Sequence, residues 1–302
     1  MPSQPIDVLS PPENVQVILL PVRNEVFSER AERLKTLARD HSLADWLLFL
    51  SHLTRAQYDT LQTLGELSLP EAGLLEQARL HGMPPLNATA LQRPKIWHEV
   101  LKSLIDSLIP HAPKPASARL QALRSTSAER LEKMADGLFE GTPEPEDLGD
   151  LPFIAAALQV IWTAWASCLD ASTLAPFNTP EVCPCCGSLP VVSVVRSSSA
   201  VNNLRYLHCS LCNSEWNIPR TTCTSCSTDK NVSYRQIEGS NGAVRAECCD
   251  SCKSYLKILV QEKNPAVDPV ADDLATLALD MLVDEAGYSR SGPNLLLLGG
   301  AA

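Results

Sequence analysis

Aromatic residues and basic charge are both scarce in this chain of 302 residues. Aromatic side chains make up 5 % of the sequence, so the hydrophobic core must be built mainly from leucine, alanine and valine. The 25 Lys and Arg residues are outnumbered by 35 Asp and Glu residues, which gives a net charge of −10. Affinity for nucleic acid depends on neutralising phosphates with Lys and Arg. The composition as a whole therefore argues against a nucleic-acid-binding protein.

The sequence also lacks the features of exported and membrane-spanning chains. Residues 1–12 have no basic segment ahead of an apolar run, so we expect no secretory signal. Residues 151–169 carry no charge, but they contain Pro152 and Gln159 and have acidic residues on both sides. Without flanking Lys or Arg, this stretch favours a buried core helix over a membrane span. Many thiols and no signal are typical of a cytoplasmic protein.

No catalytic signature is visible in the sequence. It has no glycine-rich phosphate-binding loop, no Ser, His and Asp constellation and no paired-carboxylate pattern. We therefore expect that the protein is not an enzyme, and the informative chemistry must come from its cysteines.

The chain changes character near residue 176. Before it, apolar residues recur at steps of three and four, as over residues 27–64 and 91–109, and only helices are predicted. After it, Asn, Ser, Thr and Cys become dense, and helical order returns over residues 268–287. Strands are predicted between these two parts, over residues 189–196, 201–207, 232–237 and 243–247.

Eight of the eleven cysteines form four Cys-x-x-Cys pairs, which are Cys183 and Cys186, Cys209 and Cys212, Cys223 and Cys226, and Cys249 and Cys252. Every paired cysteine recurs at an offset of 40 residues. Flanking residues follow the same offset, as Arg205 does with Arg245 and Ser214 with Ser254. The region is therefore one small unit used twice.

Two Cys-x-x-Cys turns can direct four sulfur atoms at one ion, as tetrahedral Zn–S bonds of ~2.3 Å require. A unit of about 40 residues with few aromatic side chains cannot bury enough surface to fold alone, so a metal would supply much of its folding free energy. Disulfides, a thioredoxin-like redox pair and a single iron–sulfur cluster are the alternatives. Four regularly spaced pairs favour two mononuclear metal ions, each held by four cysteines.

The spacing allows more than one grouping of the pairs. The repeat favours the first pair with the second and the third with the fourth, while a cross-braced arrangement stays open. Cys185 and Cys248 lie beside ligands without a partner at the right spacing, so we expect free thiols. Cys168 falls on the uncharged helix and is predicted to be a buried apolar residue. His208 is a less favoured alternative ligand.

The surroundings of the pairs give little support to nucleic-acid binding. Residues 183–257 contain eight Lys and Arg and five Asp and Glu, an excess of +3. Two zinc ions with four thiolates each would lower this sum to −1, so no basic footprint would remain. Trp216 and Arg220 could form a contact surface, although packing of Trp216 against the first unit is favoured.

Four segments around the pairs match a known family in order and content. They read CPCCGSLP at 183–190, LHCSLCNSEW at 207–216, RTTCTSC at 220–226 and CDSCKSYLK at 249–257. The chain thereby resembles the formate dehydrogenase accessory protein family, FdhE. The resemblance implies a cytoplasmic maturation factor that acts on the catalytic subunit of a molybdenum- or tungsten-containing formate dehydrogenase before export. It also implies rubredoxin-like ribbons that hold iron, whereas the sulfur ligands alone suit iron and zinc.

Taken together, these patterns predict an α+β multidomain protein. An all-α domain (1–177) precedes two tandem rubredoxin-like or zinc-ribbon modules (178–219 and 220–262), and a C-terminal helix and tail follow (263–302). The leading hypothesis is a non-catalytic assembly factor that binds the catalytic subunit of formate dehydrogenase. It would hold two metal ions, iron rather than zinc, and would bind no nucleic acid and insert stably in no membrane. A rubredoxin-like electron carrier and a zinc-ribbon nucleic-acid-binding protein are the alternatives.

Overall fold

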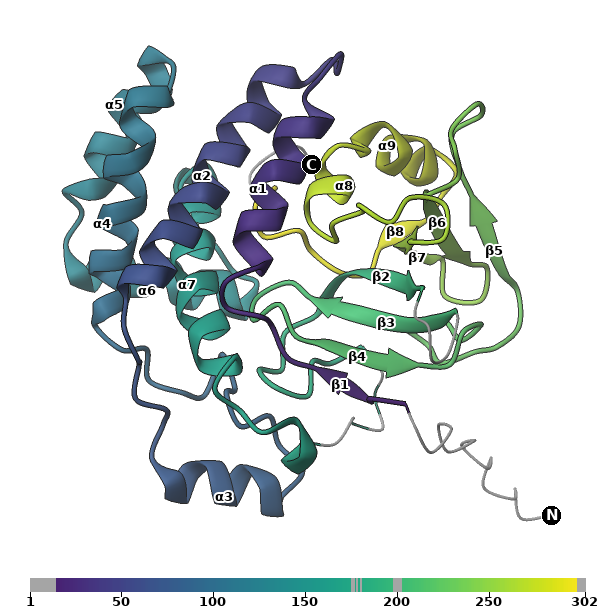
Figure 1. Ribbon diagram of the computed structural model, residues 1–302, viewed down its shortest axis with the longest axis horizontal. Helices are drawn as coiled ribbons and strands as arrows, with labels where there is room; N and C mark the ends of the chain where they lie inside the picture. The colour runs from purple at the N-terminus through teal and green to yellow at the C-terminus, as the bar shows by residue number, and fades with distance from the viewer. Residues whose placement is uncertain (1–14, 175–176, 178, 180, 198–202, 298–302) are drawn as a thin grey trace.

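The computed structural model describes residues 15–174, 177, 179, 181–197 and 203–297. In it a layer of helices packs beside one mixed β-sheet, and two short helices from the end of the chain cover the far part of that sheet (Figure 1). The helices are α1 (Val26–Leu37), α2 (Ala44–Thr63), α3 (Ala72–Leu80), α4 (Ile96–Leu108), α5 (Lys114–Arg124), α6 (Ala128–Glu140), α7 (Leu151–Ala166), α8 (Ala271–Leu274) and α9 (Leu277–Glu285).

Helix α7 forms the centre of the helical layer. Fourteen of its 16 residues are buried, and it packs against α2, α4 and α6. Its one buried amide, Gln159, accepts a hydrogen bond from Gln57 of α2 and donates one to the carbonyl of Ser210. A helix of this length spans about 24 Å, less than the ~30 Å core of a bilayer. The prediction of a buried core helix is confirmed, and no helix among the described residues is long and apolar enough to cross a membrane.

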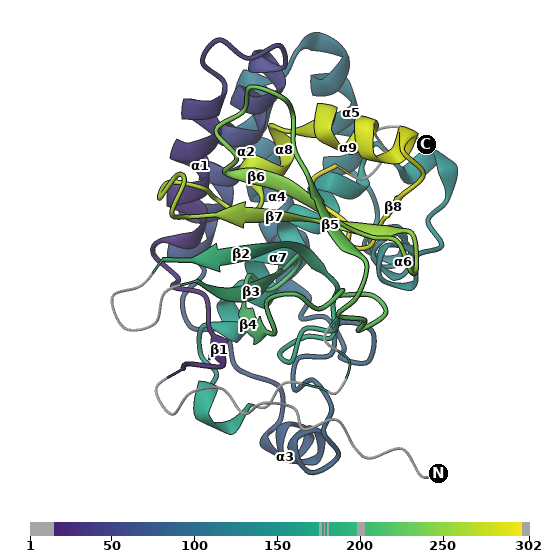
Figure 2. The ribbon, with the colours of Figure 1, turned by 90° about the vertical axis from the view of Figure 1, so that its right-hand side faces the viewer.

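Both cysteine-rich units lie in a single sheet with the strand order β1-β4-β3-β2-β7-β6-β5, and β8 lies beside β7. Figure 2 looks onto this sheet, with α7 and α4 behind the strands. The strands are β1 (Ile18–Leu19), β2 (Pro190–Arg196), β3 (Leu204–Cys209), β4 (Glu215–Ile218), β5 (Val232–Arg235), β6 (Val244–Cys249), β7 (Ser254–Val260) and β8 (Ser289–Arg290).

The two units are joined through their backbones. Strand β3 is antiparallel to both β2 and β4, and β6 is antiparallel to both β5 and β7. Between the units, β2 and β7 pair in parallel, with Ser193 opposite Ile258. Since this pairing makes one continuous sheet, the picture of two separate tandem modules misses a main contact of the fold. The domain boundaries at 177, 219 and 262 stay a prediction.

The N-terminal region is not entirely helical, contrary to the prediction. Ile18 and Leu19 form β1, which pairs with Trp216 and Glu215 of β4. A strand of two residues is too short to show the alternation of apolar and polar side chains by which strands are predicted from sequence.

The C-terminal helix is broken into α8 and α9 by a buried lysine. The Nζ atom of Lys257 donates hydrogen bonds to the carbonyl oxygens of Asp273 and Thr276, at 2.9 and 3.1 Å. The same carbonyls accept backbone bonds from residues three positions later, Thr276 and Leu279, so the regular helical ladder is interrupted at this point. Within α9, Met281 and Leu282 are 65 % and 53 % exposed.

Candidate metal centres

Each Cys-x-x-Cys pair lies on a turn that ends in the same backbone conformation. The residue after the second cysteine has a positive φ in all four turns: Gly187 (80°), Asn213 (59°), Ser227 (57°) and Lys253 (57°). In three of the turns this residue also donates its backbone N–H to the carbonyl of the first cysteine, at 2.9 to 3.0 Å. Only glycine enters this region without steric cost. Because three of the four residues are not glycine, the shared turn has little signal in the sequence.

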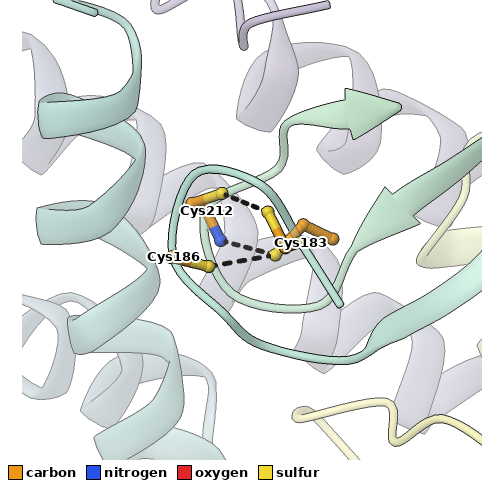
Figure 3. Close-up of side chains that lie close together, drawn as sticks. Cys183, Cys186 and Cys212 are labelled. Carbon is orange, nitrogen blue, oxygen red and sulfur yellow. Dashed lines mark hydrogen bonds between the residues drawn. The ribbon is translucent and has the colours of Figure 1, made fainter. Parts of the chain in front are cut away.

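The first cluster is formed by Cys183, Cys186, Cys209 and Cys212, and all four are buried. Their sulfur atoms lie within 4.8 Å of one another. The Sγ atoms of Cys183 and Cys212 are 3.6 Å apart (Figure 3). Those of Cys186 and Cys209 are 3.4 Å apart. A tetrahedral ion with ~2.3 Å bonds sets its sulfur ligands about 3.8 Å apart. The cluster is thus close to the size that such an ion requires.

The second cluster is formed by Cys223, Cys226, Cys249 and Cys252. The Sγ atoms of Cys223 and Cys252 are 3.7 Å apart, as are those of Cys226 and Cys249. Here Cys226 and Cys252 are exposed, so this cluster opens to solvent. The Cys-x-x-Cys pair at 183 and 186 therefore shares a cluster with the pair at 209 and 212, and the pair at 223 and 226 shares one with the pair at 249 and 252. The grouping that the repeat favoured is confirmed, and the cross-braced one is not found.

Hydrogen bonds to sulfur prepare these cysteines to carry negative charge. The backbone N–H groups of Leu211 and Cys212 both donate to the Sγ of Cys209, at 3.4 Å. In the second unit, the hydroxyl of Ser254 lies 3.0 Å from the Sγ of Cys252. Donors around a thiolate favour its charged form, which is the form that binds metal.

Without a cation the clustered thiols cannot all ionise. Burial raises the pKa of the Cys183 thiol well above its ordinary value. Burial also opposes ionisation of Cys212, but hydrogen bonds from neighbouring thiols lower its pKa to about 5. In the second cluster, burial raises the pKa of Cys223 to about 12, while hydrogen bonds that include the Ser254 hydroxyl overcome burial and lower the pKa of Cys252 to about 7. A metal ion removes the conflict by balancing all four thiolates.

The first cluster is fastened to the helical layer by hydrogen bonds from outside the cysteine region. The backbone N–H groups of Leu86 and Ala88 donate to the carbonyls of Cys185 and Cys186, at 2.8 and 3.0 Å. The side chain of Asn213 donates to Thr163 of α7, at 2.8 Å. Sequence reasoning missed these partners because they lie far along the chain from the turns that they support.

The other candidates near the clusters have structural partners of their own. Nδ1 of His208 lies 2.9 Å from Glu215, and its Nε2 lies 3.2 Å from Asn213, so His208 is not part of a cluster. Burial opposes the charge of Glu215, but His208 and Arg196 lower its pKa to about 2. Trp216 is 1 % exposed within the main core, which confirms the packing interpretation.

The three unpaired cysteines differ from one another. Cys185 is buried, and hydrogen bonds with the Cys183 and Cys212 thiols lower its pKa, so it is an additional thiol at the edge of the first cluster. Cys248 is buried in a small core with Tyr255. Cys168 is exposed, and the prediction of burial is wrong, because α7 ends at Ala166 and Cys168 lies in the turn that follows.

A helical layer that supports two four-cysteine clusters on one shared sheet defines a protein with paired tetrathiolate metal-binding sites. Models of three parts of one family match the chain in order: FdhE, N-terminal (residues 15–179), FdhE, central domain (182–220), and FdhE, C-terminal domain (221–297). The chain belongs to the FdhE family, as the resemblance of its cysteine segments predicted.

Named relatives support this membership over most of the chain. "Protein FdhE homolog" of Serratia proteamaculans is 39 % identical over 295 residues, which cover 96 % of this chain and 93 % of the relative. "Protein FdhE" of Salmonella choleraesuis is 39 % identical over 284 residues, which cover 94 % and 91 %. The crystal structure of the FdhE protein from Pseudomonas aeruginosa matches with a TM-score of 0.82 at 33 % identity and covers 95 % of this chain and 100 % of that one.

Proposed function

We propose that this chain is a non-catalytic maturation factor that binds the catalytic subunit of a formate dehydrogenase in the cytoplasm and is needed for its activity. The family is one of formate dehydrogenase accessory proteins, and this chain covers its relatives almost completely. The observation that carries the proposal is the pair of four-cysteine clusters, in which every ligand is a protein side chain and no position is left open for a substrate. Among the described residues, these two are the only His, Cys, Asp and Glu groups of three or more that are arranged to hold a metal.

The two clusters are suited to different tasks. The first is enclosed between the sheet and the helical layer, where Leu86 and Thr163 contact its turns. It would hold an ion whose role is to fix the junction of the two layers. The second exposes Cys226 and Cys252 and would present its ion at the surface, within reach of a partner.

We favour iron over zinc in both clusters, because the family resemblance implies rubredoxin-like iron. Four thiolates at these distances suit either ion. Iron would supply a one-electron redox change at each cluster, whereas zinc would make both clusters structural. Metal analysis of protein purified without metal-affinity resin, together with its visible absorption spectrum, distinguishes the two.

The test of the assembly role is recovery of the client. A tagged chain expressed in its own organism should enrich the formate dehydrogenase catalytic subunit, and deletion of the gene should abolish formate oxidation. Complementation by the wild-type chain should restore the activity, and so should Cys168→Ser, which changes an exposed cysteine outside both clusters. Replacing the exposed ligand Cys252 by Ser should not. If the tagged chain never enriches the subunit and deletion leaves formate oxidation intact, the proposal is wrong.

A rubredoxin-like electron carrier is the second candidate, and the exposure of Cys226 and Cys252 favours it, since electron transfer needs a site near the surface. Visible absorbance during a redox titration would test it. A reversible one-electron transition in the purified protein supports the carrier, and a protein that contains only zinc eliminates it.

A further inference from the structure

A groove runs along α1 and reaches the turn of the first metal cluster at Asn213. It consists of two adjoining hollows of about 460 and 470 Å³. The first is bounded by residues 19–22 and α1, and the second by α1 and residues 265–269. Both hollows are lined by Glu29, Arg196 and Asp268, so they form one continuous depression. In Figure 1 the chain passes from β1 into α1, and the segment between them borders the first hollow.

Three carboxylates at the start of α1 line the groove without a countercharge. Glu25 and Glu29 border the first hollow, and Glu29 and Glu32 border the second. All three are exposed, and none forms an ion pair within the described part of the chain. Partial burial raises the pKa of Glu29, and the nearby charges of Glu25 and Asp268 add to this shift while Arg196 opposes it.

The other charges of the groove neutralise one another. Arg196 binds Glu215 through two hydrogen bonds of 2.6 and 2.7 Å. Arg33 binds Asp272 in the same manner, at 2.8 and 2.6 Å. The three glutamates are therefore a net negative surplus, and the groove is complementary to a cation or to a chain of cations.

Arg30 adds an observation that is independent of this charge. Its side chain is fully buried, its Nε donates to Asp268 at 3.2 Å, and its Nη2 donates to Asn213 at 2.9 Å. The Nη1 atom has no hydrogen-bond partner among the described residues. Arg30 and both of its partners line the first hollow. A buried N–H without an acceptor is unfavourable, and a ligand oxygen in the first hollow would supply one.

We infer that the groove binds an extended, basic segment of a partner protein. A peptide offers both features that the groove needs, which are cationic side chains for the glutamates and a main-chain carbonyl for Nη1 of Arg30. Glu25 and Glu29 are separated by about 6 Å along the helix axis. Alternate side chains of an extended peptide lie about 6.6 Å apart. The preferred segment therefore carries Lys or Arg at every second position.

This inference rests on the proposed function in one respect, namely that the segment belongs to the client subunit. A free anion would be repelled by the negative surplus, and a metal ion would leave Nη1 of Arg30 without an acceptor. Both are outcomes that the binding experiment separates from peptide binding.

The test uses the full, metal-loaded chain and a fluorescein-labelled peptide of alternating Arg and Ser residues. Fluorescence anisotropy should show saturable binding that weakens as salt is added, because exposed charges are screened. The triple change Glu25→Gln, Glu29→Gln and Glu32→Gln should weaken binding by about tenfold. The matched control changes three exposed, unpaired glutamates elsewhere, Glu71, Glu140 and Glu285, to Gln. It removes the same charge and should leave the affinity unchanged.

A second variant tests the buried donor. Arg30→Lys keeps the positive charge but removes Nη1, and with it the Nη2 bond to Asn213, so it should weaken peptide binding without changing its salt dependence. Equal affinity of the wild type, the triple variant and the control overturns the inference, and so does a lack of binding by the wild type. Binding of inorganic phosphate or of divalent cations that outcompetes the peptide also overturns it.

Recovery of the client then separates the two proposals. If the wild type enriches the catalytic subunit and the triple variant does not, both hold. If both chains enrich it equally, the groove is not the docking site although the assembly role stands. If neither enriches it, the assembly role fails, and the peptide experiment decides the groove alone.

Discussion

Arg205 and Glu247 form a buried ion pair between the two cysteine-rich units. Nη2 of Arg205, on β3, lies 2.7 Å from Oε1 of Glu247, on β6, and both side chains are almost fully enclosed. Nη1 of Arg205 donates to the carbonyl of Thr222 at 2.9 Å, and the hydroxyl of Tyr234 donates to Oε2 of Glu247 at 3.1 Å. The pair thus holds both units and the segment between them in one arrangement.

Removing one partner of this pair should destabilise the protein strongly. Arg205→Met leaves a buried carboxylate without its cation, and we expect the free energy of unfolding to fall by about 3 to 5 kcal/mol. Urea unfolding of the metal-loaded protein measures this loss. The double variant with Glu247→Leu should recover most of it, because no buried charge is left unpaired. Arg79→Ala, which removes an exposed ion pair with Glu76, should have almost no effect. Similar losses for Arg205→Met and Arg79→Ala would contradict this prediction.

The buried Glu215 predicts a dependence of stability on pH. Its pKa is lowered from 4.5 to about 2 in the folded chain. An acid with a lowered pKa stabilises the fold at pH values above its unfolded pKa, and this contribution disappears as the pH falls through the folded pKa. A shift of this size corresponds to about 3 kcal/mol. Glu215→Gln should therefore be less stable than the wild type by about this amount at neutral pH.

The comparison between the Glu215→Gln variant and the wild type should be made by denaturant unfolding at several pH values. Metal loss in acid affects both proteins alike, so the difference between their free energies of unfolding reports the contribution of Glu215. It should shrink between pH 4.5 and pH 2. A difference that stays constant over this range would show that Glu215 is not charged through its contacts with Arg196 and His208.

The unequal exposure of the clusters predicts unequal release of their ions. A chelator can approach Cys226 and Cys252 from solvent, whereas all four ligands of the first cluster are buried. Challenge with a coloured chelator should give one fast and one slow phase of equal amplitude. Cys226→Ser should remove the fast phase, and Cys168→Ser should change neither phase. A single phase that releases both ions together would refute the assignment of different environments.

The first cluster should matter more for the helical layer than the second. Cys183→Ser removes a buried ligand at the junction with Leu86 and Ala88. We expect a loss of more than about 4 kcal/mol and early melting of the helices. Cys252→Ser should leave the helical layer intact, since Cys252 faces solvent. Thermal unfolding followed by far-UV circular dichroism compares the two, and equal melting temperatures would count against the prediction.

Spacing along the chain was sufficient to predict the eight cysteines and to favour the grouping that the structure shows. A Cys-x-x-Cys turn is local, and an offset of 40 residues between identical pairs reports a duplication directly. The helices up to Glu140 were predictable for the same reason, because amphipathic periodicity is local, and α7 was predictable from its uncharged run. The parallel pairing of β2 with β7 was not, since it joins residues about 65 positions apart through backbone atoms that carry no sequence signal.

Buried charge explains a further difference between prediction and structure. Lys257 lies in the apolar strand β7 with no exposed surface, where a sequence pattern would place it outside. Its hydrogen bonds to Asp273 and Thr276 divide the helix that periodicity had predicted as continuous. Similarly, the partners of Asn213 and Cys185 come from the helical layer, and only the folded chain brings them together.

The parallel pairing of β2 with β7 makes the duplication head-to-tail. Strand β3 recurs as β6 at the offset of 40, and β4 stands in its unit where β7 stands in the next. A head-to-tail contact does not close on itself, and further copies could in principle be added at either end. Strand β1 covers the edge of β4, where another unit would attach, and β5 at the other end is short and partly exposed. The two residues of β1 thus cap the edge strand β4, and this cap hinders the sheet from being extended by another molecule at that edge.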